Sequence, residues 1–171
     1  AELVRSLAQL EGPRWWRLLY LYPSTLREDV LDVIAEEPRV VKYVDMPVQH
    51  LSDRMLHAMR RGITAPRQQA LLETIRRRIP GVTLRTTLIA GFPGESEADH
   101  AESLAGVRAG LFDRVGVFTY CREEGTPSHD LPGQVAPELA EERKAELLAA
   151  QQEVHLARNA AKLGSEQEVL V

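Results

Sequence analysis

The chain has 171 residues, of which 44% are hydrophobic and 27% are charged. This length and balance are typical of one soluble globular domain with a sizeable core, and they argue against a disordered chain. The formal net charge of -4 attracts no nucleic acid overall, and no apolar stretch approaches the roughly twenty residues that span a bilayer. We therefore expect a cytoplasmic protein with no membrane partner and, for this segment, no bound nucleic acid.

The chain opens with a predicted helix and a predicted strand. The first twelve residues form an amphipathic pattern with Leu3, Leu7 and Leu10 on one helical face. The following run WWRLLYLY is rich in aromatic and aliphatic residues and is halted by Pro23. Such a run predicts a buried strand.

A helix and a second strand are predicted next. Ser24 or Thr25 is predicted to cap the start of this helix, because small polar side chains are common at that position. Pro38 is predicted to end it. The segment VVKYVDMPV then predicts a short strand that runs into Gln49.

Two helices are predicted between this strand and the third one. The first runs from Ser52 or Asp53 through Arg61, and Gly62 is expected to end it. The second covers about residues 66 to 79, with a proline in its first turn and a Pro-Gly pair after its end.

The second half of the chain repeats the strand-helix pattern twice. The β-branched run TLRTTLIAG predicts a strand that breaks into FPGE before a helix over about residues 96 to 109. The run RVGVFTY predicts a fourth strand, and a long proline and glycine loop separates it from one long helix between Glu138 and about Leu163.

Alternating strands and helices, with strands that are nearly continuous apolar runs, predict an α/β fold with a parallel sheet covered by helices. Four such units begin a barrel and an open sheet alike, so both architectures remain open at this point. Both chain ends suggest a piece of a longer protein. The first residue is not an initiator methionine, and the last eight read as an edge strand without a partner, so we expect truncation on both sides.

Ligands of such folds bind at the carboxyl ends of the strands, and polar and glycine residues gather at these positions in the chain. The segment GFPGE, with Gly91 and Gly94, allows a ligand to approach the backbone closely, or it is only a tight turn with Glu95 near the helix start. Both interpretations stay open from the residues alone.

Three other polar residues lie at or near strand ends. The Gln49 amide can donate and accept hydrogen bonds to a ligand, and His50 is a candidate catalytic group or simply a solvated residue beside a helix cap. Arg85 lies inside an apolar strand and needs an anionic partner, either a ligand or a neighbouring acid such as Asp45.

The single cysteine, Cys121, excludes an internal disulfide and any metal site built from several thiolates. Two acidic residues follow it closely and would raise its pKa, so we interpret it as an incidental thiol. The histidine spacing matches no metal motif, and no metal ligand is predicted. The basic triplet at residues 76 to 78 is interpreted as a solvated helix face rather than a nucleic-acid contact.

Read together, several segments resemble the methylthiotransferase family of radical S-adenosylmethionine enzymes. They are YLYPS, YVDMPVQHLSDRMLHAMRR, LRTTLIAGFPGE, FTYCREEGTP and AQQEVHLARNAAKLGSEQEVLV, in this order and over nearly the whole chain. The details YLYP, the Gln49-His50 pair, LRTT and the pair Gln151-Gln152 resemble the branch that modifies an aspartate of the twelfth protein of the small ribosomal subunit. The other branch modifies adenosine in transfer RNA.

The resemblance implies a partial TIM-type barrel of six parallel strands, of which residues 1–163 supply the last four β/α units and the long final helix. Residues 164–171 would begin a small β domain of the TRAM type. The implied cofactor is S-adenosylmethionine. By the resemblance, Gln49 and Arg85 would lie near this cofactor. Its adenosyl pocket would be lined by Thr87, Ile89, Gly91 and Phe92 and closed by Phe118 and Tyr120.

The family also uses two 4Fe-4S clusters, one on a CxxxCxxC motif and one on cysteines of an upstream domain. Neither set of cysteines is present here. The resemblance therefore implies a ribosomal-protein methylthiotransferase whose present segment is inactive alone. The alternatives are a fragment of a transfer RNA methylthiotransferase, a non-catalytic module that binds S-adenosylmethionine or a protein, and an unrelated barrel such as an aldolase, which would need a lysine at a strand end.

Overall fold

Strands and helices alternate along the chain, as the sequence predicts. The structure is a computed structural model that describes residues 1–166. Its elements in chain order are α1 (Glu2–Ala8), β1 (Trp16–Leu18), the 3-10 turn η1 (Pro23–Thr25), α2 (Glu28–Glu36), β2 (Val40–Asp45), α3 (Asp53–Ala58), α4 (Ala65–Arg78), β3 (Thr83–Ala90), α5 (Glu97–Arg108), β4 (Arg114–Thr119) and α6 (Pro137–Ala160). Every strand is thus followed by at least one helix.

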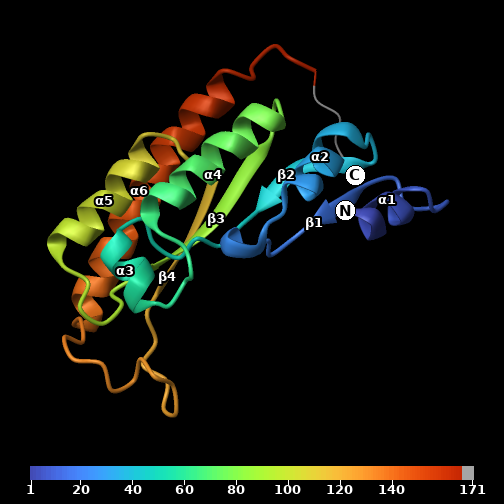
Figure 1. The fold of residues 1–171 in the computed structure, drawn as a ribbon. Helices are drawn as coiled ribbons and strands as arrows, with labels where there is room; N and C mark the ends of the chain where they lie inside the picture. Colours follow the sequence, from blue (N-terminus) through green and yellow to red (C-terminus); the bar gives the residue numbers. More distant parts are fainter. Residues whose placement is uncertain (167–171) are drawn as a thin grey trace.

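The four strands form one parallel sheet in the order β1-β2-β3-β4. Figure 1 shows α4, α5 and α6 stacked along one face of β3 and β4. An open doubly wound sheet carries helices on both faces and reverses its strand order, whereas a β/α barrel does neither. The fold is therefore α/β with a partial barrel, which decides the alternative that the strand pattern left open.

The core lies between the sheet and these helices. Its largest fully buried side chains come from all four units: Phe112, Leu31, Ile34, Met46, Met55, Leu56, Ile75, Ile79, Leu84, Leu88 and Leu147. Leu84, Leu88 and Ala90 of β3 belong to this core. Because side chains alternate along a strand, the residues between them project from the opposite face of the sheet.

The predicted strand over WWRLLYLY is much shorter in the structure. The strand spans only Trp16–Leu18, and its register with β2 shifts between the two ends. Tyr20 has a φ of 58°, a left-handed conformation that a regular ladder does not accommodate, and its side chain is 76% exposed. The composition of the run predicted a strand correctly, but the backbone at Tyr20 ends it early.

The predicted apolar face of the first helix is wrong. Leu3 is 70% and Leu10 is 51% exposed, and the core contacts of α1 are made by Ala8 and the partly buried Val4. The helix ends at Ala8, so Leu10 lies beyond it, where the helical spacing no longer applies.

The predicted cap of the second helix is also wrong. Ser24 and Thr25 lie in the turn η1, which Pro23 opens, and α2 begins later, at Glu28. Arg27 occupies the position before α2 and makes no side-chain cap hydrogen bond. Proline fixes the backbone angle that such a turn needs, so the polar residues after it serve the turn and not the helix.

Helix α3 ends earlier than the glycine signal predicted. Its last residue is Ala58, and Arg60 takes the left-handed position with a φ of 54°. The Arg61 amide donates to Leu56 O at 3.0 Å and the Arg60 amide to His57 O at 3.0 Å, which is the Schellman pattern. An arginine therefore occupies the position where glycine is usual.

The C-terminal helix α6 ends at Ala160, three residues before the predicted end, and a turn with Gly164 at a φ of 81° follows. Most of the predicted small β domain, residues 167–171, lies outside the described residues. Among residues 1–166, no helix is long and apolar enough to cross a membrane.

Candidate functional site

The face of the sheet opposite the helices carries the side chains that the resemblance assigns to the cofactor. On β3, Arg85, Thr87 and Ile89 alternate with the buried core residues. On β4, Val117 belongs to the core, so Phe118 projects to the same open face, where it is 63% exposed. The structure thus brings these predicted residues to one surface at the carboxyl half of the sheet.

A hollow of about 490 Å³ lies on this face. The residues that line it are Tyr20, Pro47, Gln49, Thr87, Ile89, Phe118, Thr119, Tyr120 and Cys121. A second cavity of about 370 Å³ shares Gln49 and Ile89 with it and adds Phe92 and the loop residues Pro127, Ser128 and Leu131. Five of the cofactor residues that the resemblance implies thus line one hollow, while Arg85 and Gly91 lie outside both lining sets.

Two polar atoms in the wall of this hollow are buried without a partner. Within residues 1–166, neither Gln49 Oε1 nor the Tyr120 hydroxyl makes a hydrogen bond. The Tyr120 ring packs edge-on against Phe92, with 5.3 Å between ring centroids. Because unsatisfied buried polar groups are costly, this wall is suited to a ligand with a flat apolar body and a polar edge.

Gln49 is held in place by its own backbone. Its φ is 71°, a left-handed conformation that is uncommon for glutamine. The backbone N-H of Gln49 donates to the Thr87 carbonyl oxygen at 2.9 Å. The backbone carbonyl oxygen of Gln49 accepts from the Ile89 N-H at 2.9 Å. Strained backbone of this kind persists only where its surroundings fix it, and it is frequent at binding sites.

The GFPGE segment forms a tight turn whose geometry depends on Gly91. Gly91 has a φ of 79°, and a Cβ atom at this position would lie 2.4 Å from Ala140 Cβ of α6. The Gly91 amide donates to the Glu95 carboxylate, which folds back across the turn. Glu95 is therefore more than a residue near a helix start, because its buried carboxylate closes the turn beside the hollow.

Glu95 is the centre of a buried ionic network. His50 Nε2 lies 3.2 Å from Glu95 Oε1, and Arg143 Nη1 lies 3.3 Å from Glu95 Oε2. The Ser52 amide donates to His50 Nδ1 at 2.9 Å, which places the ring proton on Nε2, where it is donated to Glu95. The side chains of His50, Glu95 and Arg143 are 2%, 1% and 5% exposed.

This network changes the interpretation of His50. The residue is buried rather than solvated, lines neither cavity, and has both ring nitrogens engaged. The geometry gives it a positioning role, since it holds the carboxylate that in turn holds the Gly91 amide. The position of His50 therefore does not support the predicted catalytic role of this residue.

We expect stability to fall in acid because of Glu95. Burial raises the pKa of this carboxyl, but hydrogen bonds from His50 and the Gly91 amide and the charge of Arg143 outweigh burial, so the pKa lies below its ordinary value of 4.5. The unfolded chain then binds the proton first, and stability is lost as the pH falls, from about pH 5 downward. Urea unfolding at a series of pH values should show this loss, with a shallower slope below pH 5 in Glu95→Gln.

A second buried carboxylate, Asp99, was missed by the sequence analysis. It accepts from Ser52 Oγ at 2.6 Å and from Arg54 Nε at 3.3 Å, and it forms a capping box with Ser96 at the start of α5. Burial opposes these donors, but together they lower the pKa of Asp99 far below its ordinary range. The pattern Ser-x-x-Asp before an apolar helix is a sequence signal that could have identified it.

Replacing Asp99 with alanine should destabilise the protein by about 1–3 kcal/mol, because a helix cap and a buried hydrogen bond from Ser52 are lost together. The midpoint of urea unfolding measures this change. Glu102→Ala, on the exposed side of the same helix, is the matched control and should change stability by less than about 0.5 kcal/mol. Equal effects of both substitutions would contradict the cap.

Arg85 has the neighbouring acid that the sequence suggested. Its Nη1 donates to Asp45 Oδ1 at 2.7 Å, and the two residues are register partners on β3 and β2. The hydrogen bond to Asp45 raises the pKa of Arg85, although partial burial opposes it. Asp45 occupies only one edge of the Arg85 guanidinium, and the Arg85 side chain remains 34% exposed.

Cys121 and the basic triplet also have defined surroundings. The exposed Cys121 thiol donates to Glu123 Oε1 at 3.0 Å, and this acid raises the thiol pKa, in agreement with an incidental thiol. Arg76 pairs with Asp113, and Arg78 pairs with Glu28. Two of the three arginines thus make tertiary contacts, while Arg77 contacts only Thr74 of the same helix.

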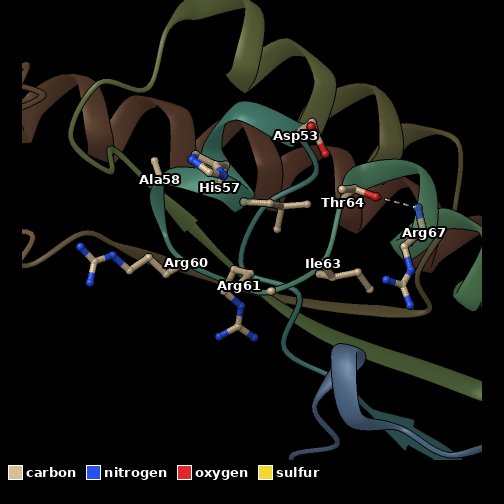
Figure 2. A pocket seen from close by; sticks show the side chains of 10 residues that line it. Asp53, His57, Ala58, Arg60, Arg61, Ile63, Thr64 and Arg67 are labelled. Carbon is tan, nitrogen blue, oxygen red and sulfur yellow. Dashed lines mark hydrogen bonds between the residues drawn. The ribbon is translucent and has the colours of Figure 1, made fainter.

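A larger hollow lies elsewhere, around the α3-α4 connection. Its volume is about 650 Å³, and Arg60, Arg61 and Arg67 contribute to its wall. Figure 2 shows the ends of these three side chains well apart, with Arg60 directed to the left and Arg61 and Arg67 downward from separate positions. They do not converge on one ligand, so we place the candidate site at the strand ends around Gln49 and Ile89.

A family model, the Radical SAM superfamily, matches residues 1–105. Ribosomal protein uS12 methylthiotransferase RimO from Desulforudis audaxviator is 47% identical over 170 residues, covering 99% of this chain and 38% of that protein. The protein of the same name from Geobacter sulfurreducens is 44% identical over 169 residues, with coverage of 99% and 38%. The chain thus spans less than two fifths of the length of these relatives.

Solved structures support the fold independently. The chain is similar to coproporphyrinogen III oxidase (HemN) from Escherichia coli, a radical SAM enzyme, with a TM-score of 0.64, 20% identity, and coverage of 81% of this chain and 31% of that one. It is also similar to Elp3 from Methanocaldococcus infernus, with a TM-score of 0.53, 19% identity, and coverage of 79% and 31%. Since the family model matches well over half of the residues, the chain belongs to the radical SAM superfamily.

Proposed function

We propose that this chain is part of a methylthiotransferase that adds a methylthio group to the β-carbon of an aspartate in ribosomal protein uS12, the twelfth protein of the small subunit. The observation that carries the proposal is an identity of 41–47% over nearly all of the chain to proteins named uS12 methylthiotransferase. The segments YLYP, LRTT and Gln49-His50 point to the same branch. Its substrate would be met in the cytoplasm.

The hollow on the open face fits the adenosyl part of S-adenosylmethionine. The unpartnered Gln49 Oε1 and Tyr120 hydroxyl would meet the polar groups of the adenosine, and Ile89 and Phe118 would contact its flat apolar surface. Thr87 and Phe92 would complete the pocket, Thr87 at its border toward Arg85, and Gly91 would shape the turn beside it. When bound and reduced, S-adenosylmethionine supplies the carbon-centred radical that removes a hydrogen atom from the substrate.

The chain's own residues do not fit an iron-sulfur cluster. Its single cysteine is exposed and carries a raised pKa, and residues 1–166 contain no group of three or more metal-ligating side chains. Family membership implies a cluster, and we propose that the parent protein holds two 4Fe-4S clusters on cysteines outside these residues. The 171-residue chain alone should therefore be inactive.

Mass spectrometry of uS12 tests the function. The full-length protein, reconstituted with iron and sulfide and supplied with S-adenosylmethionine and a chemical reductant, should increase the mass of uS12 by one methylthio group in place of one hydrogen. Unchanged uS12 together with modified transfer RNA would assign the chain to the other branch. Binding of S-adenosylmethionine without modification of either substrate would leave only a binding module.

A further inference from the structure

The guanidinium of Arg85 has one edge bound and one edge free. Nη1 donates to Asp45 Oδ1 at 2.7 Å, while Nη2 makes no hydrogen bond to any residue from 1 to 166. The side chain lies on the open face of the sheet, two residues before Thr87 on the same strand, which is about 7 Å along it. The free edge is therefore next to the floor of the 490 Å³ hollow.

The pair with Asp45 holds this edge in a fixed place. The Asp45 side chain is only 4% exposed, and it lies directly opposite Arg85 in the register of β2 and β3. A buried ion pair contributes little to stability compared with apolar residues of similar size. A charged pair in the middle of a sheet is thus poorly explained by folding alone, and it leaves a positioned fork of N-H donors.

Space in front of the free edge is kept open by Gly116. This glycine lies in the interior of β4 and pairs in register with Thr87. The atoms nearest to a Cβ atom at Gly116 would be Arg85 Nη2 at 3.6 Å, Thr87 Oγ1 at 3.9 Å and the Thr86 carbonyl oxygen at 4.0 Å, all ordinary contacts, so packing does not require glycine here. Glycine weakens a strand interior, and it often marks a place where a ligand approaches closely.

Thr87 adds a second donor to the same space. Its side chain is 8% exposed, and its hydroxyl makes no hydrogen bond within the described residues. One guanidinium edge and one hydroxyl, both facing the gap at Gly116, match the two oxygens of a carboxylate.

We propose that Arg85, Thr87 and the gap at Gly116 form a subsite that binds the side-chain carboxylate of the substrate aspartate. This inference rests on the proposed function. The β-carbon that reacts is bonded directly to that carboxyl carbon, so fixing the carboxylate also fixes the reacting atom beneath the cofactor hollow. Arg85 takes no part in bond making, and its contribution is to select and orient a carboxylate-bearing side chain.

The test compares two forms of uS12 as substrates of the full-length reconstituted protein, one with the natural aspartate and one with asparagine in its place. The wild-type protein should prefer the aspartate form by about 10-fold to 100-fold in kcat/KM, since a hydrogen bond to a charged group is lost with asparagine. Arg85→Gln alone would leave Asp45 buried and unpaired. The double variant D45N/R85Q, in which two amides replace the ion pair, should reduce this preference to within about threefold.

Gly116→Ala provides a second variant that does not disturb the ion pair. Its Cβ atom fits the fold but narrows the gap, so modification of the aspartate form should fall severalfold with an unchanged melting temperature. A preference for aspartate that persists in D45N/R85Q would overturn the inference. The inference would also be overturned if D45N/R85Q lost affinity for S-adenosylmethionine, measured by calorimetry, to the same extent as it lost activity. Arg85 would then bind the carboxylate of the cofactor itself. A wild-type protein that modifies neither uS12 form would instead refute the proposed function.

Discussion

Glu95→Ala should destabilise the protein by about 3–5 kcal/mol, because it removes the buried partner of Arg143 and leaves that buried guanidinium with only the exposed Glu97 as a counter-ion. Arg143 is 5% exposed, and its guanidinium would lose the Glu95 carboxylate 3.3 Å away. The His50 Nε2 proton and the Gly91 amide would lose their acceptor as well. Urea unfolding of the full-length protein at pH 7, followed by circular dichroism, measures the change.

Glu97→Ala is the matched control for this substitution. Glu97 also contacts Arg143, at 3.4 Å, but its side chain is 83% exposed. Exposed ion pairs contribute at most about 1 kcal/mol, so the control should change stability by no more than that. If both substitutions cost the same, burial of the Glu95 network would not be what stabilises the turn beside the hollow.

The sequence predicted the strands and helices well where the pattern is local. The runs TLRTTLIAG and RVGVFTY became β3 and β4, because β-branched and aliphatic residues in short runs favour strands in any context. The same reasoning failed at Tyr20, where one left-handed residue ends a strand that composition alone would continue. Backbone angles of single residues are set by tertiary contacts that no local pattern records.

The site was predictable in outline and not in its supporting contacts. Parallel strands meet at one edge, so residues such as Gln49 and Tyr120 were expected near each other, and both line one hollow. Glu95 and Arg143 lie 48 residues apart, and their pairing depends on how α6 packs over the GFPGE turn. Burial of this kind follows from the complete fold, which explains why Glu95 looked like a simple turn residue.

Gly91→Ala should destabilise the protein by about 2–5 kcal/mol, for two reasons that add. The new Cβ atom would lie 2.4 Å from Ala140 Cβ and 3.3 Å from Ala140 Cα, so helix α6 would have to shift. A φ of 79° also strains any residue with a side chain. Thermal and urea unfolding of the full-length protein measure the loss.

Gly81→Ala separates these two causes. Gly81 has nearly the same φ, 77°, but a Cβ atom there would meet nothing within 4 Å, so only the backbone strain of about 1–2 kcal/mol applies. The excess cost of Gly91→Ala over Gly81→Ala is then the cost of moving α6 away from the turn. Because Arg143 lies on α6 and holds Glu95, that movement should also loosen the Gly91 amide and weaken binding of S-adenosylmethionine in calorimetry. Equal costs at both glycines would show that α6 does not press on the turn, and the link between this helix and the hollow would be lost.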